Sequence, residues 1–455
     1  MKATTWLRLI CLMVIVMSGS CASRVESVVE PLHGHWEGAA VFQGAELKIS
    51  VDFEEGSEGL RASLSSPDLL WFKMPLAAAS YNAPRVHFEV PLTPPRTVFE
   101  GTVKGKTIEG YSLEGGQRIP FSLRQVSAVP EQPPYRPENV QFRNADVTLS
   151  GTLLVPSSQQ KQRHPAVVFL HGAGEHPRQD YLFYADQFAR RGIAALVYDK
   201  RGVGDSTGNM RTADQHALVS DALAAVELLK GRDDIDAQRI GLWGHSLGGM
   251  VAPIAASRSV DAAFLILIAP PGVTLGEAEA WDDEFNLRKQ GFPDDVIARS
   301  NQINAQLNEY LRTGKGRAEI ETALQNARRE KWFAQTDLPE TAPSSRASSA
   351  YGGLDFDLNP LPFFQKVKVP LLVVFGELDN RIPPQKSVAQ IEQALKDGGN
   401  VDFDIKIFPG ADHSIRLPNG KRPDTGGKWD WARIAPGYME TVLDWTQKRV
   451  GLSQK

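Results

Sequence analysis

The chain has 455 residues, of which 42% are hydrophobic and 23% are charged, and its net charge at pH 7 is −4. This length exceeds that of a usual single domain and predicts two or three domains with sizeable cores. A slightly acidic chain without a long run of Lys or Arg presents no positive field to a phosphate backbone. We therefore expect no nucleic-acid partner.

The N-terminus has the three-part layout of a secretory signal. Lys2 and Arg8 precede an apolar run, Leu9–Met17, and small residues follow it. Because this run is too short to span a bilayer, residues 1–22 are predicted to be a signal for export. Two cleavage sites are open: "SGSC" resembles a bacterial lipobox with Cys21 as the lipidated first residue, and "SCA" suits ordinary signal peptidase.

Cysteine usage favours the lipoprotein. The chain contains two cysteines, Cys11 and Cys21, and Cys11 lies within the predicted signal. The processed chain would have neither a disulfide nor a cysteine metal site, so a lone Cys directly after a signal is better explained by lipid attachment. We expect an exported bacterial protein that is periplasmic or anchored to the outer membrane through lipid on Cys21.

Residues 31–126 are predicted to form a small β-rich domain. The stretches "AELKISVDF", "RVHFEV" and "RIPFSL" alternate apolar and polar residues, which indicates strands of a sandwich or barrel with one buried face. The proline-rich "VPEQPPYRPEN" follows. Its prolines exclude helix and favour a stiff linker over residues 127–138.

The pattern changes in residues 139–455. After a hairpin-like "FRNADVTLSGTLLVP", continuous apolar runs such as "PAVVFLHG", "IAALVYD" and "AFLILIAP" alternate with helical stretches. This alternation predicts an α/β fold, a mostly parallel sheet with helices on both faces. The segment at about 273–360 lacks strand runs and predicts a helical cap over the C-terminal edge of the sheet, where such folds bind ligands.

Ser246 lies in "RIGLWGHSLGGMVAPIAA", between a predicted strand and a predicted helix. Gly244 and Gly248 permit a tight turn there, because larger side chains would clash. Such a turn exposes the serine hydroxyl and directs the first N–H groups of the helix toward developing negative charge. This context favours a nucleophile over a serine in a flexible loop.

A serine nucleophile requires a base and an acid that orients the base. His413, in "FPGADHSIRLP", is the one histidine of nine that follows Ser246 in the chain, as the strand order requires. The stretch "GELDN" supplies Glu377 and Asp379. We favour Asp379, because a shorter carboxylate one step further into the loop can reach the imidazole Nδ1–H. Asp412 adjoins the histidine and is expected to shape its loop.

An oxyanion hole needs two hydrogen-bond donors. The first candidate is the backbone N–H of Leu247, directly after the serine. The second should come from "FLHGAGEHPRQ", a loop after the first long parallel strand whose glycines let the backbone approach a substrate. We favour Ala173 N–H there, with Gly172 as the second choice.

Five motifs occur in order along the chain: "HGAG", "YDKRGVGDSTG", "GHSLGG", "GELDNRIP" and "GADHS". Through them, the chain from residue 140 onward resembles the α/β-hydrolase superfamily, and within it the dienelactone-hydrolase and prolyl-oligopeptidase-like branch. It looks closest to bacterial carboxylesterases with an N-terminal β-domain, the EstD-like group. The resemblance implies that Ser246, Asp379 and His413 are nucleophile, orienting acid and base, and it does not specify the substrate.

Other features receive structural interpretations. Asp199 and Arg201 are expected to hold structure near the site, and His245 to pack beside the nucleophile. The "HGH" at residues 33–35 lacks the carboxylate cluster of a metal site. Four aromatic residues of the insertion could either line an acyl pocket or pack the cap onto the sheet: Trp281, Phe285, Trp332 and Phe333.

The sequence thus predicts a serine hydrolase that cleaves carboxylic esters of short to medium acyl chains through an acyl-enzyme, with no metal and no organic cofactor. Its expected partner is a small-molecule ester. A prolyl-oligopeptidase-like peptidase and an acyltransferase are alternatives, although the β-rich domain is too short for a gating propeller. A binding or scaffold protein of the cell envelope is the non-enzymatic alternative.

Overall fold

The computed structural model describes residues 31–42, 45–57, 59–91, 97–114, 116–157, 162–345, 352–417 and 433–452. The predicted signal, residues 1–22 with Cys21, lies outside these ranges. None of the helices within them combines the length and the apolar composition needed to cross a membrane.

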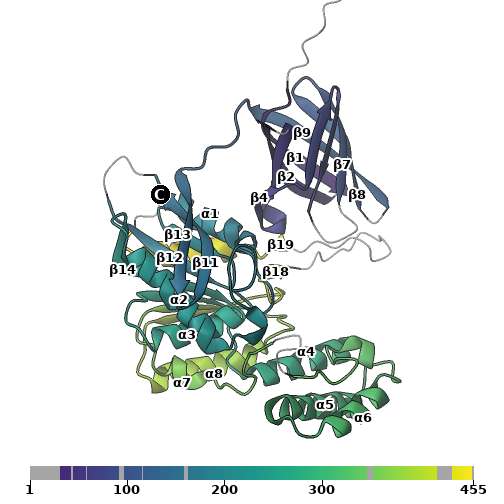
Figure 1. Ribbon diagram of the computed structural model, residues 1–455, viewed down its shortest axis with the longest axis vertical. Coiled ribbons are helices and arrows are strands. Elements are labelled where there is room, and N and C mark those ends of the chain that lie inside the picture. Colours follow the sequence, from purple (N-terminus) through teal and green to yellow (C-terminus); the bar gives the residue numbers. More distant parts are fainter. Residues whose placement is uncertain are drawn as a thin grey trace, which may run out of the picture.

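The first nine strands form one antiparallel sheet, the N-terminal sheet (Figure 1). Its order is β4-β3-β2-β1-β9-β8-β7-β6-β5, and β3 also contacts β5, so the sheet curls toward a barrel. The strands are β1 (Gly34–Phe42), β2 (Ala45–Gly56), β3 (Gly59–Ser66), β4 (Trp71–Pro75), β5 (Ala78–Asn82), β6 (Arg85–Glu89), β7 (Val98–Lys104), β8 (Thr107–Glu114) and β9 (Gln117–Ser127).

Alternating side chains explain the core of this sheet. In β9, Ile119, Phe121 and Leu123 are buried and the residues between them are exposed, as expected when successive side chains point to opposite faces. Phe53 and Phe88 meet edge to face at the centre of the same core, with ring centroids 5.9 Å apart.

The next eight strands form a second sheet of order β10-β11-β13-β12-β14-β15-β16-β17. The pairs β10–β11 and β11–β13 are antiparallel, and the remaining pairs are parallel. The strands are β10 (Tyr135–Asn144), β11 (Val147–Pro156), β12 (His164–Leu170), β13 (Ala194–Tyr198), β14 (Ile235–His245), β15 (Phe264–Ile268), β16 (Leu371–Gly376) and β17 (Phe403–Phe408). Every residue of β12, β13, β15 and β16 is buried, which accounts for their continuous apolar runs.

Strand β10 begins at Tyr135, inside the linker expected over residues 127–138. That linker is therefore shorter than the sequence indicated. The reason is that β10 is an edge strand, where Pro137 can leave its missing N–H on the side without a partner strand.

Helices cover both faces of the second sheet, and together they form what we call the α/β unit. α2 (Gln215–Lys230), α3 (Leu247–Ala256) and α8 (Pro384–Asp397) pack in the core on one face, and α1 (Leu182–Arg190) and α9 (Tyr438–Arg449) in the core on the other. Short elements complete the unit: η2 (Arg178–Tyr181), η3 (Met210–Thr212), β18 (Arg416–Leu417) and β19 (Arg433–Ile434).

The chain between β15 and β16 carries the helical insertion. It contains α4 (Leu275–Lys289), α5 (Asp294–Thr313), α6 (Arg317–Ala327), η4 (Phe333–Gln335) and α7 (Leu361–Phe364). α4 begins at a capping box, in which Thr274 and Glu277 each accept the other's backbone N–H. α5 and α6 lie away from the sheet (Figure 1) and pack in a core of their own with Leu287 and Trp332.

Candidate active site

Ser246 stands on the sharp turn between β14 and α3. Its φ of 54° and ψ of −117° lie in a region that non-glycine residues rarely adopt. Two backbone hydrogen bonds hold the turn, from Ser246 N–H to Ile268 O at 2.9 Å and from Gly249 N–H to Ser246 O at 2.8 Å. The strained backbone therefore presents the serine side chain at the end of a rigid strand.

Glycine is required on both sides of this turn. A Cβ added at Gly244 would lie 2.2 Å from the carbonyl oxygen of Gly248, and one added at Gly248 would lie 2.3 Å from Leu170 O. Both obstacles are backbone atoms, which cannot move aside as a flexible side chain can. The spacing of G-x-S-x-G is thus dictated by the close approach of α3 to β12 and β14.

We expect Gly248→Ala to lower the free energy of unfolding by about 3 kcal/mol or more, because overpacking against backbone cannot relax. Urea unfolding followed by circular dichroism measures the change. The matched control is Gly231→Ala, whose added Cβ would make ordinary contacts at 3.7 Å. A loss for Gly248→Ala no larger than that of the control would contradict this account of the turn.

His413 and Asp379 form a close pair behind the serine. Nδ1 of His413 lies 2.9 Å from both carboxylate oxygens of Asp379. Asp379 is fully buried, and its Oδ1 also accepts the backbone N–H groups of Arg381 and Ile382 at 2.8 and 2.9 Å. An ionised carboxylate in this position keeps the imidazole proton on Nδ1 and leaves Nε2 free to accept a proton.

The two other carboxylates considered from the sequence shape loops. Glu377 accepts the backbone N–H of Gly410 at 2.8 Å. Asp412 Oδ1 accepts the backbone N–H groups of Ser414 and Arg416, both at 2.9 Å. Both carboxylates fix the chain around the histidine, and Asp379 is the one that contacts its ring.

Ser246 and His413 line the same cavity, the catalytic cavity, of about 240 Å³. Its other lining residues come from the loop after β12, the end of β14, α4 and the segments before and after β16: Gly172, Ala173, His176, His245, Leu275, Ala278, Glu279, Asp282, Leu354, Phe356, Arg381 and Ile382. In the part of the chain that the structure describes, no hydrogen bond joins Ser246 Oγ to the His413 ring. Such bonds are often long until substrate binds.

The loop after β12 faces the serine, because a Cβ added at Gly172 would lie 3.7 Å from Ser246 Cβ. The Gly172 N–H donates to the Tyr181 hydroxyl at 3.0 Å and is therefore already used. Within the described ranges, the N–H groups of Ala173 and Leu247 have no protein acceptor. Leu247 is also the first residue of α3, where backbone N–H groups are unpaired within the helix.

Lys200 stabilises the loop after β12 through hydrogen bonds to its carbonyl oxygens, a role that the sequence did not predict. Its side chain is buried, and Nζ donates to the carbonyl oxygens of Gly172 at 2.8 Å and Gly174 at 3.0 Å. Burial lowers the pKa of Lys200 to about 8. The available signal was its place in "YDKRG", next to Asp199, which is bound by Arg178 at 2.6 Å.

Lys200→Met keeps a similar length and removes both hydrogen bonds. We expect kcat/KM to fall about a hundredfold, because a shift of the loop near 1 Å misplaces the Ala173 N–H, the oxyanion donor predicted from the sequence. Ester hydrolysis measures the loss. Lys230→Met, on exposed ion pairs at the end of α2, serves as the control and should retain activity. Equal activity of the two variants would contradict the role of Lys200.

The same variant has a pH signature. Because the folded protein releases the Lys200 proton near pH 8 and the unfolded chain near 10.5, the folded state binds fewer protons between these values. Wild-type stability relative to Lys200→Met should therefore rise with pH across this window, by up to about 3 kcal/mol. Urea unfolding at pH 7.5 and pH 10 compares the two proteins, and a constant difference would contradict the shifted pKa.

His245 and the arginine pairs have structural roles. His245 Nε2 lies 3.3 Å from the His413 carbonyl oxygen, and burial together with the nearby His413 lowers its pKa to about 3. His245 is therefore neutral at physiological pH and packs beside His413. Arg201 binds Asp221 with two hydrogen bonds of 2.6 Å.

Helix α4 supplies one wall of the catalytic cavity. Asp282 pairs with Arg381, and Trp281 Nε1 donates to the Asp379 carbonyl oxygen at 3.1 Å. Glu279 is half-buried, and burial together with the nearby carboxylates raises its pKa to about 8. Of the four aromatic residues in question, none lines this cavity, and Trp332 and Phe333 pack in the insertion's own core.

The described residues contain no group of three His, Cys, Asp or Glu side chains placed to hold a metal ion. His35, from the "HGH" stretch, is bonded to Asp52, with Nδ1 and Oδ1 2.7 Å apart.

The sheet order, the strained serine after β14 and the buried acid–histidine pair define an α/β-hydrolase. More particularly, the chain belongs to the Hydrolase_4 family (serine aminopeptidase, S33), whose model matches residues 161–417.

Several curated proteins are similar to the chain. Esterase EstD of Thermotoga maritima is 24% identical over 290 residues, 62% of this chain and 62% of the relative. Quorum-quenching protein AidA of Acinetobacter baumannii is 36% identical over 117 residues, 26% of this chain and 38% of the relative. Acylamino-acid-releasing enzyme of Rattus norvegicus is 24% identical over 384 residues, 81% of this chain and 44% of the relative. The chain thus spans less than two thirds of each of these proteins.

Among solved structures, α/β hydrolase GrgF from Penicillium sp. sh18 is similar, with a TM-score of 0.44 and 21% identity over 70% of this chain and 100% of that chain. An esterase of Pyrobaculum calidifontis is also similar, with a TM-score of 0.40 and 19% identity over 62% of this chain and 79% of that chain.

Proposed function

We propose that the protein is a serine hydrolase that cleaves carboxylic esters with short to medium acyl chains. The observation that carries the proposal is one cavity lined by Ser246 on a strained turn and by His413, whose Nδ1 is bonded to the buried Asp379. Membership of the Hydrolase_4 family and the similarity to an esterase support it.

In the proposed reaction, Ser246 Oγ attacks the ester carbonyl carbon while His413 Nε2 takes the hydroxyl proton. The N–H groups of Leu247 and Ala173 bind the oxyanion of the tetrahedral intermediate. When the intermediate collapses, His413 returns the proton to the leaving alcohol and the acyl-enzyme remains. Water, deprotonated by the same His413, then attacks the acyl-enzyme and releases the acid. Asp379 stabilises the imidazolium in both steps.

The insertion is the proposed cap of this site. The size and the apolar wall of the catalytic cavity support the expected acyl length. The volume of the catalytic cavity is below the range of about 300–1,000 Å³ that is typical of small-molecule pockets. Part of its wall is apolar and consists of Leu275, Ala278, Leu354 and Phe356. Short to medium acyl chains suit a cavity of this kind.

The test is hydrolysis of p-nitrophenyl esters from acetate to palmitate. We expect steady turnover with a maximum at short or medium chains. A maximum at palmitate would contradict the proposed acyl length. A burst of one equivalent without turnover would replace hydrolysis by transfer or peptide cleavage, and no acylation at all would contradict the enzyme and favour an envelope scaffold.

A peptidase is the second candidate. It is favoured by the similarity to a protein named acylamino-acid-releasing enzyme, which extends over 81% of this chain. The same groups would act on an amide, with His413 giving its proton to a leaving amine. Release of p-nitroaniline from acylated amino-acid anilides, faster than release of p-nitrophenol from matched esters relative to the uncatalysed rates, would establish it.

We further propose that residues 1–22 direct export, with lipid on Cys21 holding the protein in the periplasm or at the outer membrane. The proposed domains are residues 31–126, the β-rich domain, and 139–455, the hydrolase domain. The export proposal is supported by the N-terminus, where charged residues are followed by an apolar run and then by small residues. Mass spectrometry of the protein purified from membranes would detect a diacylglyceryl group on Cys21, and an intact residue 1 would contradict export.

A further inference from the structure

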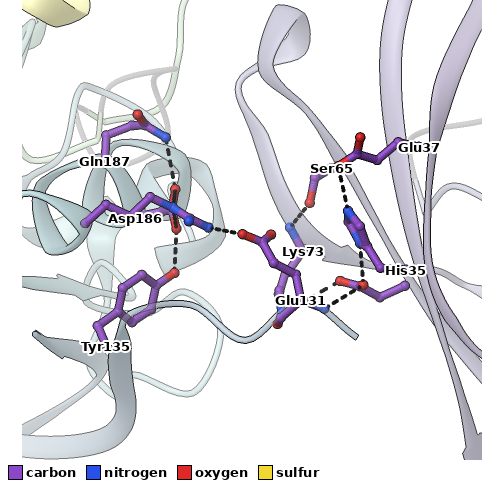
Figure 2. A network of polar contacts seen from close by, with 10 residues as sticks. His35, Glu37, Ser65, Lys73, Glu131, Tyr135, Asp186 and Gln187 are labelled. Atoms are coloured by element: carbon purple, nitrogen blue, oxygen red, sulfur yellow. Dashed lines mark hydrogen bonds and ion pairs between the residues drawn. The ribbon is translucent and has the colours of Figure 1, made fainter. Parts of the chain in front are cut away.

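Polar contacts fix the N-terminal sheet against the α/β unit (Figure 2). Asp52 accepts hydrogen bonds from His35 Nδ1 at 2.7 Å and from the backbone N–H of Glu131 at 3.2 Å. Lys73 Nζ donates to the Glu131 carbonyl oxygen at 2.9 Å, and the Glu131 carboxylate binds Arg190 of α1 at 2.7 Å. This network holds the connecting segment and both sheets in one arrangement.

Strand β4 and the turn before it, η1 (Pro67–Leu69), contact the α/β unit: β4 lies against α1 and η2, and η1 against β19. Side chains at the start of β4 and just before it point to different cores: Leu70 and Phe72 pack against the core of the α/β unit, and Trp71 packs against the core of the N-terminal sheet. Beyond Lys73, whose φ is 45°, Met74 also packs against the core of the N-terminal sheet. Gln179 Nε2 donates to the Phe72 carbonyl oxygen at 2.9 Å. The N-terminal sheet therefore packs next to η2, which follows the loop after β12.

Between these parts lies a second cavity, the interdomain cavity, of about 390 Å³. This volume falls within the usual range of about 300–1,000 Å³ for small-molecule sites. Its wall is mostly apolar and aromatic, with contributions from both parts of the chain: Leu69, Leu70, Trp71, Met74, His176, Gln179, Asp180, Tyr181, Tyr184, Trp243, His245, Ile268, Ser414 and Arg416.

The interdomain cavity adjoins the catalytic cavity. His176 and His245 line both, and the His245 and His413 rings are 4.9 Å apart. Ser414, the residue directly after the base, lines the interdomain cavity. In the proposed reaction His413 returns its proton to the leaving alcohol, so the alcohol lies on the histidine side of a bound ester, which is the side where the two cavities adjoin.

Backbone strain gathers around the same cavity. Six non-glycine residues within the described ranges have φ in the left-handed region. Five of them line the interdomain cavity or directly adjoin a residue that does: Leu70 at 59°, Lys73 at 45°, Ser246 at 54°, Ala269 at 48° and Ile415 at 56°. Strained conformations persist where the surrounding structure enforces them, and they concentrate at ligand sites.

Unused donors lie in the wall. Trp243 is buried, and its Nε1 has no acceptor among the residues that the structure describes. Arg416 Nε likewise has no hydrogen-bond partner within the described ranges, and it lies 3.9 Å from Asp412 Oδ2. Because buried donors are nearly always paired, the wall suits a ligand that brings an oxygen acceptor along with an apolar ring.

We propose that the interdomain cavity binds the leaving alcohol of the substrate, and that this alcohol is apolar and carries an aromatic ring. The inference rests on the proposed ester hydrolysis and assigns a role to the N-terminal sheet. Trp71 contributes a ring surface to the bound alcohol, and the aromatic residues Tyr181, Tyr184 and Trp243 complete the wall from the α/β unit.

The test compares two esters of one acid, methyl acetate and 2-phenylethyl acetate. Trp71→Ala should lower kcat/KM for 2-phenylethyl acetate about tenfold or more and leave methyl acetate within about twofold, because one ester uses the cavity and the other does not. Met74→Trp, which fills the cavity, should give the same selective loss. The control is Tyr81→Ala, an aromatic residue that packs against the same core and does not line the cavity.

Active sites in each variant are counted with a fluorophosphonate, so that misfolded protein does not enter the rates. Equal losses for both esters, or no loss in either variant, would overturn the proposal. Selectivity that appears instead with methyl 3-phenylpropanoate, which carries its ring on the acyl side, would also overturn it.

A binding measurement separates this inference from the proposed function. Calorimetric titration with 2-phenylethanol should show binding to the wild type that is lost or at least tenfold weaker in Trp71→Ala, whether or not esters are cleaved. Failure of all ester hydrolysis with this binding intact would contradict the proposed function alone. Absence of binding to the wild type would contradict the cavity assignment.

Discussion

Replacing Ser246 by alanine is expected to lower kcat for p-nitrophenyl ester hydrolysis by at least about a thousandfold, because the nucleophile of a triad carries most of its effect. The oxyanion donors and the cavity stay in place, so KM should change little. The fold should be unaffected, since alanine meets the same backbone demand at this turn. Stopped assays with purified wild type and variant measure the ratio.

The control for this substitution is Ser220→Ala, on α2, where the serine hydroxyl is bonded to the His216 carbonyl oxygen and faces solvent. Its activity should equal that of the wild type. Residual activity of Ser246→Ala above about one part in a hundred, a level well above the triad expectation, would place the nucleophile elsewhere.

Asp379→Asn is expected to lower kcat about a thousandfold to ten-thousandfold, because an amide cannot hold the imidazole in the tautomer that accepts the serine proton. The carboxylate is fully buried, and it also accepts two backbone N–H groups. The amide oxygen of asparagine can keep those two bonds, so the loop should stay folded while the base loses its orientation.

Glu377→Gln is the matched control for the acid. Glu377 stands two residues earlier on the same loop, and its carboxylate accepts the Gly410 N–H, a bond that an amide oxygen can also accept. We expect kcat/KM within about threefold of the wild type, because exchanging a charged acceptor for a neutral one in this loop hydrogen bond should change the rate only slightly. A larger loss for Glu377→Gln than for Asp379→Asn would exchange the two assignments.

The pattern of hydrophobic residues predicts the strands of this chain well where a strand is buried on one face or at every position. The alternation "RIPFSL" matches β9, and "AFLILIAP" matches β15, which is buried at every position. The boundary at residues 127–138 was less accurate, because Pro137 suggested a linker and the sequence does not reveal that β10 would lie at a sheet edge. The position of a strand in its sheet is a tertiary property.

The groups of the proposed triad could be singled out because each has a local signature. Gly244 and Gly248 frame Ser246 through contacts with neighbouring backbone, and His413 was the one candidate in its part of the chain. The supporting groups were not predictable. Lys200 reaches the loop at residues 172–174 through two hydrogen bonds to carbonyl oxygens, and no spacing along the sequence encodes that reach.

The packing of the N-terminal sheet against the α/β unit could not be predicted from the sequence. The alternation of Leu70 and Phe72 with Trp71 toward different cores depends on where the N-terminal sheet docks. The preference for Ala173 over Gly172 as the second oxyanion donor also depends on a tertiary contact, the hydrogen bond from Gly172 N–H to the Tyr181 hydroxyl. Such contacts between distant segments decide which backbone groups stay free for a substrate.

The proposed function requires Ser246 to be an activated nucleophile. The most direct measurement is peptide mapping by mass spectrometry after treatment with a fluorophosphonate. We expect one adduct, on the peptide that contains Ser246, which is absent from Ser246→Ala and forms far more slowly in Asp379→Asn. An unmodified protein, or an adduct on another residue, would contradict it.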